Sequence, residues 1–151
     1  MEIKIYEEEP IVLSLGDDCR LKEMIMVANY NFCNYDIKED KFPLTELSNP
    51  GKALLVSLFS FNQRISSQEV ISQMKLKGFR PASLVELIYF EMAYPELCTS
   101  VPIIALGSIY RDSFGINSVP QFVLDKNGRN LYLDLFDGDW EQGDKFLAVA
   151  I

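Results

Sequence analysis

The sequence predicts one α+β domain over residues 1–151, with a mostly antiparallel sheet and two or three helices. Segments with helical periodicity lie in the first two thirds of the chain, whereas strand-like alternation dominates the last third. The 151 residues, 48% of them hydrophobic, suffice for one core without a metal or disulfide.

The N-terminal part predicts two short strands and a helix. The strands are expected over residues 2–6 and 11–15. Asp18 is expected to cap a helix over residues 19–28. One face of this helix is apolar at helical spacing and consists of Leu21, Met24, Ile25 and Ala28. Residues 29–43 read as loop, with one short strand at residues 35–37.

The middle of the chain predicts a buried strand followed by a helix. Residues 52–61 are apolar and carry no helix cap, which is typical of a central strand. Ser66, followed three residues later by Glu69, forms the sequence of a capping box. The apolar side of that helix consists of Val70, Ile71, Met74 and Leu76. Gly78 stands where a left-handed residue ends a helix.

A second helix follows almost at once in KGFRPASLVELIYFEMAYPEL. Ser83 and Glu86 form another capping box, and Pro95 ends the helix. Because the residue before a proline avoids the helical region, residues 79–82 predict a rigid corner between the two helices. Arg80 at this corner is expected to donate to the last carbonyls of the first helix.

The last third predicts a meander of strands. The strands are expected over residues 101–106, 118–125, 129–136 and 145–151. A Lys-Asn-Gly turn at residues 126–128 joins the second and third of them as a hairpin. A polar loop over residues 137–144 precedes the last strand.

The charge and the residue counts exclude several classes of function. A net charge of −8 repels phosphate, so no nucleic-acid binding is expected. The acidic N-terminus is unlike a signal peptide, and no apolar run could span a bilayer. We therefore expect a cytoplasmic protein without membrane contact, whose acidic surface suits either a basic partner or solubility alone.

The chain has no histidine, which excludes Ser-His-Asp and Cys-His catalysis and histidine-based zinc sites. Its three cysteines are Cys19, Cys33 and Cys98, an odd number without a C-x-x-C pair. This count is typical of reduced, buried and inert thiols. No cofactor motif occurs, and no cofactor is predicted.

The acidic stretch DLFDGDWEQGD is one candidate binding site. Asp137, Asp139 and Glu141 alternate as the oxygen ligands of a calcium loop can, and Trp140 is the only tryptophan. The glycine of an EF-hand loop would stand one position earlier than Gly143, and the closing glutamate is missing. Two interpretations remain, a solvated acidic loop and a binding face, with Trp140 either packed on the core or stacked on a ligand.

The aromatic stretch around Tyr30, Phe32 and Tyr35 is the other candidate. Three asparagines alternate with these side chains, and tyrosine with asparagine suits adaptable recognition. The same aromatic rings could equally cover an edge of the core. Both interpretations stay open at the level of sequence.

Several motifs resemble a widespread set of small uncharacterised bacterial proteins. Those proteins carry a G-[FY]-R-P-A-x-x-x-E-L corner, an A-L-G-S strand and a closing D-W…R-F-L-A-V strand. The matching segments here include LKEMIMVANYNFCNYDI, GFRPASLVELIYFEMAYPEL, PIIALGS, VPQFVLDKNGRNLYLDLF and DWEQGDKFLAV. Lys145 stands where an arginine is usual. The resemblance covers roughly residues 21–149 and implies a fold but no activity.

A second resemblance is to compact bacterial C-type-lectin-like domains. Gly78, Arg80, Pro81 and Glu86 match the G-x-R-L-P-[ST]-x-x-E motif of those domains, without its leucine. The resemblance implies that the loops before the last strand form the binding face, which again indicates residues 137–141. The disulfides and calcium triplets of those domains are not recognisable here.

The sequence favours a non-enzymatic binding or protein-interaction module with a protein partner. The absence of histidine and of any nucleophile motif supports this hypothesis. One alternative is a small enzyme that uses a carboxylate pair or a cysteine thiolate. Another is a calcium-dependent glycan binder.

Overall fold

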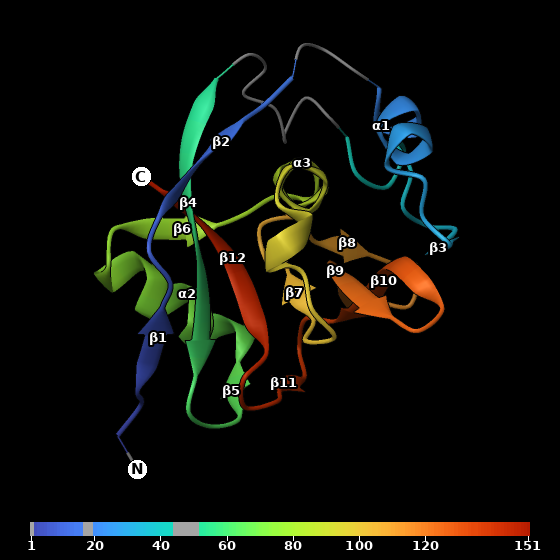
Figure 1. Cartoon of the computed structure of the whole chain (residues 1–151). Helices are drawn as coiled ribbons and strands as arrows, with labels where there is room; N and C mark the ends of the chain where they lie inside the picture. The colour runs from blue at the N-terminus through green and yellow to red at the C-terminus, as the bar shows by residue number, and fades with distance from the viewer. Residues whose placement is uncertain (1, 17–19, 44–51) are drawn as a thin grey trace.

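The computed structural model describes residues 2–16, 20–43 and 52–151 (Figure 1). Its helices are α1 (Leu21–Ala28), α2 (Ser67–Leu76), α3 (Leu84–Ala93) and the 3-10 helix η2 (Pro95–Leu97). Its strands are β1 (Ile5–Glu7), β2 (Ile11–Ser14), β3 (Phe32–Cys33), β4 (Ala53–Phe61), β5 (Ile65–Ser66), β6 (Phe79–Pro81), β7 (Ile103–Ile104), β8 (Tyr110–Arg111), β9 (Asn117–Asp125), β10 (Gly128–Leu135), β11 (Asp139–Trp140) and β12 (Lys145–Ala150).

Ten of these strands form one mostly antiparallel sheet, which confirms the predicted α+β class. The strand order is β1-β4-β12-β7-β9-β10-β3, with β2 beside β4, β6 beside β12 and β8 beside β9. Only the β7–β12 and β3–β10 pairs are parallel. β5 and β11 make a separate two-stranded pair.

Helices cover both faces of the central strands. In Figure 1, α2 and α3 lie on opposite sides of β4 and β12. Val56 and Leu58 of β4 pack in the core with α3 and α1, whereas Phe59 and Phe61 pack with α2. Because β4 is buried on both faces, its sequence is a nearly continuous apolar run, as predicted for a central strand.

The local signals for helix ends are confirmed. The Glu69 amide donates to Ser66 Oγ (3.2 Å) at the start of α2. At α3 both bonds of the capping box form, since the Glu86 amide donates to Ser83 Oγ (3.3 Å) and the Ser83 amide to Glu86 Oε1 (2.8 Å). Gly78 has a φ of +84°, the left-handed conformation expected after α2.

The predicted corner between the two helices is a strand. Phe79–Pro81 forms β6, which pairs antiparallel with β12. The expected partner of Arg80 is also wrong. Its guanidinium forms two bonds with the Glu86 carboxylate, at 2.9 and 2.7 Å, and does not cap α2. A bidentate carboxylate satisfies the fork of an arginine better than a backbone carbonyl does.

Two smaller predictions are wrong, and one falls outside the described residues. The short strand expected at residues 35–37 is wrong, because the strand is Phe32–Cys33 and pairs parallel with β10. Leu76, expected on the apolar side of its helix, is 78% exposed. Asp18 and Cys19 lie outside the described residues.

α3 is buried along almost its whole length. Its first amide, of Leu84, donates to the Ser108 hydroxyl (2.8 Å), so the buried N-terminus of the helix is satisfied. The two carboxylates on this helix, Glu86 and Glu91, are both buried. None of the helices in the described part of the chain has the length and hydrophobicity of a membrane-spanning segment.

The A-L-G-S segment lies directly against the start of α3. The Gly107 amide donates to the Ala82 carbonyl oxygen (2.8 Å). A Cβ at Gly107 would lie 2.6 Å from that same oxygen, which is a backbone atom and cannot swing away. A glycine is therefore required here by close backbone approach.

We expect Gly107→Ala to lower the free energy of unfolding by about 1–3 kcal/mol, because the added methyl group overpacks a backbone contact. Urea denaturation followed by circular dichroism measures the loss. Gly138→Ala is the matched control, since its nearest neighbour would be 4.0 Å away. A control variant as unstable as Gly107→Ala would contradict the argument.

Candidate functional site

The end of α1 is held by a buried polar cluster. The Tyr30 hydroxyl donates to Glu91 Oε1 (2.6 Å). The Arg129 guanidinium pairs with the other oxygen of Glu91 and donates to the Ala28 carbonyl. These contacts join α1 to α3 and β10, which are far apart in the sequence.

Each group in this cluster has a partner. The Glu91 side chain is completely buried, and burial raises its pKa, while the bonds from Tyr30 and Arg129 oppose that shift. Burial and the Glu91 charge both raise the pKa of Tyr30. The Arg129 guanidinium also lies 5.1 Å from the Tyr30 ring centre and 5.7 Å from that of Phe122. Because its bonding groups are occupied, the cluster has a structural role.

The solvent-exposed side of α1 carries two large apolar residues in addition to Lys22 and Glu23. Met26 is 70% exposed, and its neighbour Val27 is equally open. Phe32 of β3 and Tyr35 add two exposed aromatic rings on the segment that follows α1. We call these four residues the α1 face. Met26, Val27 and Tyr35 are among the more exposed large apolar side chains of the described residues.

A pocket of about 390 Å³ borders this face, and we call it the α1 pocket. Its lining is mostly apolar, with charged groups among it, and consists of Lys22, Ile25, Met26, Cys33, Ile37, Lys38, Glu39 and Asp40. Glu39 fixes one wall, because its carboxylate accepts the Leu21 amide at the start of α1 (3.0 Å). The two lysines and the two carboxylates of the lining have formal charges that sum to zero.

A second hollow, of about 320 Å³, lies on the other side of α1 and is bordered by Val27, Met92, Pro95 and the cluster residues Ala28, Glu91 and Arg129. Met26 and Val27 are therefore neighbours in sequence that border different hollows. A partner that contacted the α1 face would find a depression on either side of the helix. A protein partner could contact this helix and place side chains in the hollows on its two sides.

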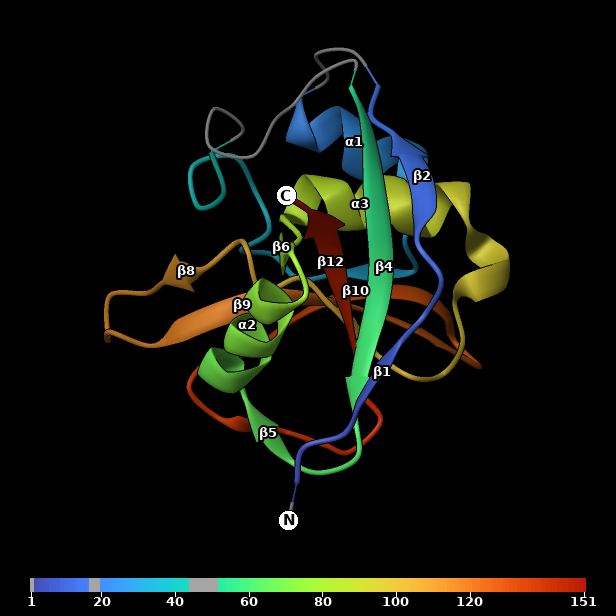
Figure 2. The same ribbon diagram turned by 90° about the vertical axis from the view of Figure 1, so that its left-hand side faces the viewer.

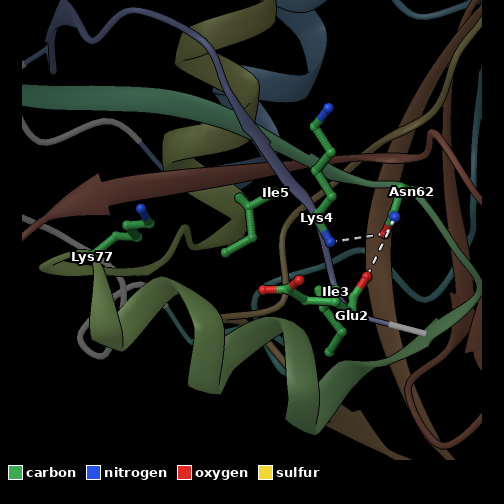
Figure 3. A pocket seen from close by; sticks show the side chains of 6 residues that line it. All are labelled: Glu2, Ile3, Lys4, Ile5, Asn62 and Lys77. Atoms are coloured by element: carbon green, nitrogen blue, oxygen red, sulfur yellow. Dashed lines mark hydrogen bonds between the residues drawn. The ribbon is translucent and has the colours of Figure 1, made fainter.

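A further hollow of about 470 Å³ lies between β1 and the end of α2 (Figure 3). Asn62 holds one of its walls, since it accepts the Lys4 amide (2.9 Å) and donates to the Glu2 carbonyl (3.5 Å). Lys4 and Lys77 border it with exposed side chains. Because its lining is charged and solvated, this hollow provides few contacts for an apolar group of a ligand.

The acidic loop turns its tryptophan inward. Trp140 is buried, packs edge-on against Phe146 at 5.8 Å, and donates its Nε1–H to Ser67 Oγ (2.8 Å). Asp137, Asp139 and Glu141 are exposed. Of the two interpretations of Trp140, packing on the core is the one that the structure shows.

No group of three or more cysteine or carboxylate side chains in the described ranges is arranged to hold a metal ion. The acidic side chains contact protein groups instead: Asp137 accepts the Asn117 side-chain amide (3.3 Å), and Asp144 the Glu141 backbone amide (3.1 Å). Glu141 also lies 3.9 Å from Arg64.

The structure places the rings of the aromatic stretch in two different environments, the edge of the core and the solvent-exposed surface. Tyr30 belongs to the buried cluster and covers an edge of the core. Tyr35 is 83% exposed, and the Lys38 ammonium lies 4.2 Å from its ring centre. Only Tyr35 and Phe32 are therefore available to a partner on this segment.

The thiols of both described cysteines have raised pKa values that make them unreactive at neutral pH. Burial raises the pKa of Cys33 and of Cys98 to about 11. At neutral pH these thiols are protonated, and a thiol is a far weaker nucleophile than a thiolate. Cys33 lines the α1 pocket, so this shift counts against thiolate catalysis there.

Sequence reasoning selected Phe32 and Tyr35 but missed Met26 and Val27 of the α1 face, although a signal was present. The helical period assigns Leu21, Met24 and Ala28 to one buried face, and leaves Met26 and Val27 as apolar residues off that face. Apolar residues outside the buried stripe of an amphipathic helix indicate a contact surface. Likewise, Glu91 falls at a core position of α3, which signals a buried carboxylate with a partner.

Comparisons with protein-family models, with curated proteins and with solved structures each gave no match. The two resemblances drawn from the sequence motifs therefore stay predictions. Inference about function rests on the geometry of the α1 face and its pocket.

We expect Arg129→Met to lower the free energy of unfolding by about 3 kcal/mol, because it leaves the Glu91 carboxylate buried without its cation. The double variant Arg129→Met, Glu91→Leu should lose less than the single one, since no unpaired charge remains. Denaturation midpoints in urea compare the two. A double variant less stable than the single variant would contradict this account of the cluster.

Alkylation of Cys33 by iodoacetamide should rise about tenfold per pH unit between about pH 7 and pH 10, because only the thiolate reacts. Since the pKa of Cys33 is raised to about 11, the thiolate appears only as the pH climbs toward that value. Peptide mass spectrometry resolves the site. An unstructured peptide with a single cysteine is the control, and its rate should level off above its ordinary thiol pKa of about 8.5. A plateau for Cys33 at the same pH would refute the shift.

Proposed function

We propose that this protein is a non-enzymatic binding module whose α1 pocket receives an apolar side chain of a protein partner. The observation that carries the proposal is the α1 pocket itself, a hollow of about 390 Å³ with apolar walls beside exposed Met26. Apolar hollows with a few polar groups are common binding sites in proteins.

A protein partner fits this surface better than a small molecule does. A small-molecule site encloses most of its ligand, whereas here Val27 and Phe32, which do not line the pocket, are also exposed apolar residues. Interfaces combine a central apolar contact with a charged rim. Lys22, Lys38 and the neighbouring carboxylates supply such a rim.

The chemistry available at the pocket supports binding rather than catalysis. Cys33 is the thiol in the described lining of the α1 pocket, and its raised pKa of about 11 keeps it protonated. Glu91, the buried carboxylate beside the second hollow, is occupied by Tyr30 and Arg129. A catalytic group must be reachable and in the right protonation state, and neither group meets both conditions.

Titration of the ¹⁵N-labelled protein with N-acetylphenylalanine amide tests the proposal. We expect amide shifts that saturate at Ile25, Cys33 and Ile37, with a Kd on the order of 1 mM, as suits a ligand of this size. N-acetylglycine amide, which has no side chain, should produce no such shifts.

Two variants complete the test. Met26→Glu places a charge at the pocket and should abolish the shifts, whereas Leu76→Glu should not, because Leu76 is an equally exposed apolar residue on α2. Shifts that map to the loop around Asp139, or that survive Met26→Glu, would refute the pocket as the binding site.

A further inference from the structure

The turn between β8 and β9 is a second apolar element on the surface, and it protrudes. Figure 2 shows this turn extending beyond the rest of the molecule on the left. Phe114 is 87% exposed, and Ile109 and Ile116 are exposed beside it. We call residues 109–117 the β8–β9 finger. The chain thus carries a convex apolar element as well as a concave one.

Hydrogen bonds fix the shape of the finger. The Asp112 carboxylate accepts the amides of Phe114 (2.8 Å) and Ile116 (2.9 Å). The Gly115 amide donates to the Asp112 carbonyl (3.0 Å), and Gly115 adopts a φ of +79°, which favours glycine. Because the turn is already ordered, inserting Phe114 into a partner costs little further conformational entropy.

The α1 pocket has the size and lining for such a ring. A cavity of about 150 Å³ already holds a benzene molecule, and the α1 pocket measures about 390 Å³. The difference leaves room for one of the flanking isoleucines. Ile25, Met26 and Ile37 supply the apolar contacts.

Electrostatics permits a second copy of the chain at this contact, because the two surfaces involved are locally neutral. Two molecules that each carry a net charge of −8 repel one another over most approaches. The finger carries one cation and one anion, Arg111 and Asp112, and the pocket carries two of each. The finger and the pocket are therefore balanced surfaces on an acidic molecule, and they can meet without adding repulsion.

We propose that the protein self-associates by inserting Phe114 of the β8–β9 finger into the α1 pocket of another copy. This inference rests on the proposed binding role of the pocket and names its occupant. Reciprocal insertion gives a closed dimer, and insertion in one direction gives an open chain.

Sedimentation velocity of the full-length protein tests the contact. We expect concentration-dependent association that strengthens as salt is raised, because salt screens the repulsion between the acidic surfaces. Phe114→Asp and Met26→Glu should each lower the association constant roughly tenfold or more, as expected for a central contact residue. Leu76→Glu should leave it unchanged.

Mixing the two interface variants gives the sharper result. Phe114→Asp keeps an intact pocket, and Met26→Glu keeps an intact finger, so their mixture should form a heterodimer although neither associates alone. A contact between two α1 faces would give the opposite pattern, with Phe114→Asp still self-associating. That pattern, or a wild-type monomer at about 1 mM, would overturn the proposal.

Failure of this inference is distinguishable from failure of the proposed function. If the wild-type protein is a monomer while N-acetylphenylalanine amide still shifts Ile25, Cys33 and Ile37 of the Phe114→Asp variant, the pocket is a binding site with a different occupant. If the amide produces no shifts in that variant, both proposals fail together.

Discussion

The burial of α3 is the constraint on which the rest of the structure depends. This helix carries two carboxylates into the interior, and a buried charge is tolerated only when it is paired. Glu86 takes its cation, Arg80, from β6, and Glu91 takes Arg129 from β10. Because the two arginines come from two different strands, these pairs fix both strands relative to α3.

The same pairing determines where the exposed surface lies. Arg129 holds the last turn of α1 by donating to the Ala28 carbonyl. Tyr30, two residues after Ala28, is held by its bond to Glu91. A helix of eight residues is too short to persist without such tertiary contacts. Once its inner side is packed by Leu21 and Met24, its outer side is committed to solvent with Met26 and Val27 on it. The α1 pocket is the space between that helix and the chain that returns along it.

The sequence predicted the features whose causes are local. The cap at Ser83, the left-handed Gly78 and the hairpin turn before Gly128 depend on residues within a few positions, and all three are confirmed. The strand Phe79–Pro81 was missed because its hydrogen bonds go to β12, almost seventy residues away. The partner of Arg80 was missed because a capping box explains Glu86 by itself, although this carboxylate fills both roles.

The candidate site shows the same division. Composition identifies the stretch from Tyr30 to Tyr35, but it cannot separate the ring that enters the core from the ring that stays outside. Periodicity indicates which residues share a face, but the packing of distant strands decides which faces are covered.

The distribution of charge relates the site to the whole molecule. A surface that is acidic almost everywhere keeps copies of a protein apart and limits contacts to places where the local charge cancels. The α1 pocket and the β8–β9 finger are such places. Exposed Met26 borders the pocket, and exposed Phe114 lies on the finger. In the proposed contact, apolar burial supplies the free energy of association, while the surrounding negative charge disfavours other orientations. The specificity of the proposed contact therefore depends on where the surface charge cancels rather than on any single charged pair.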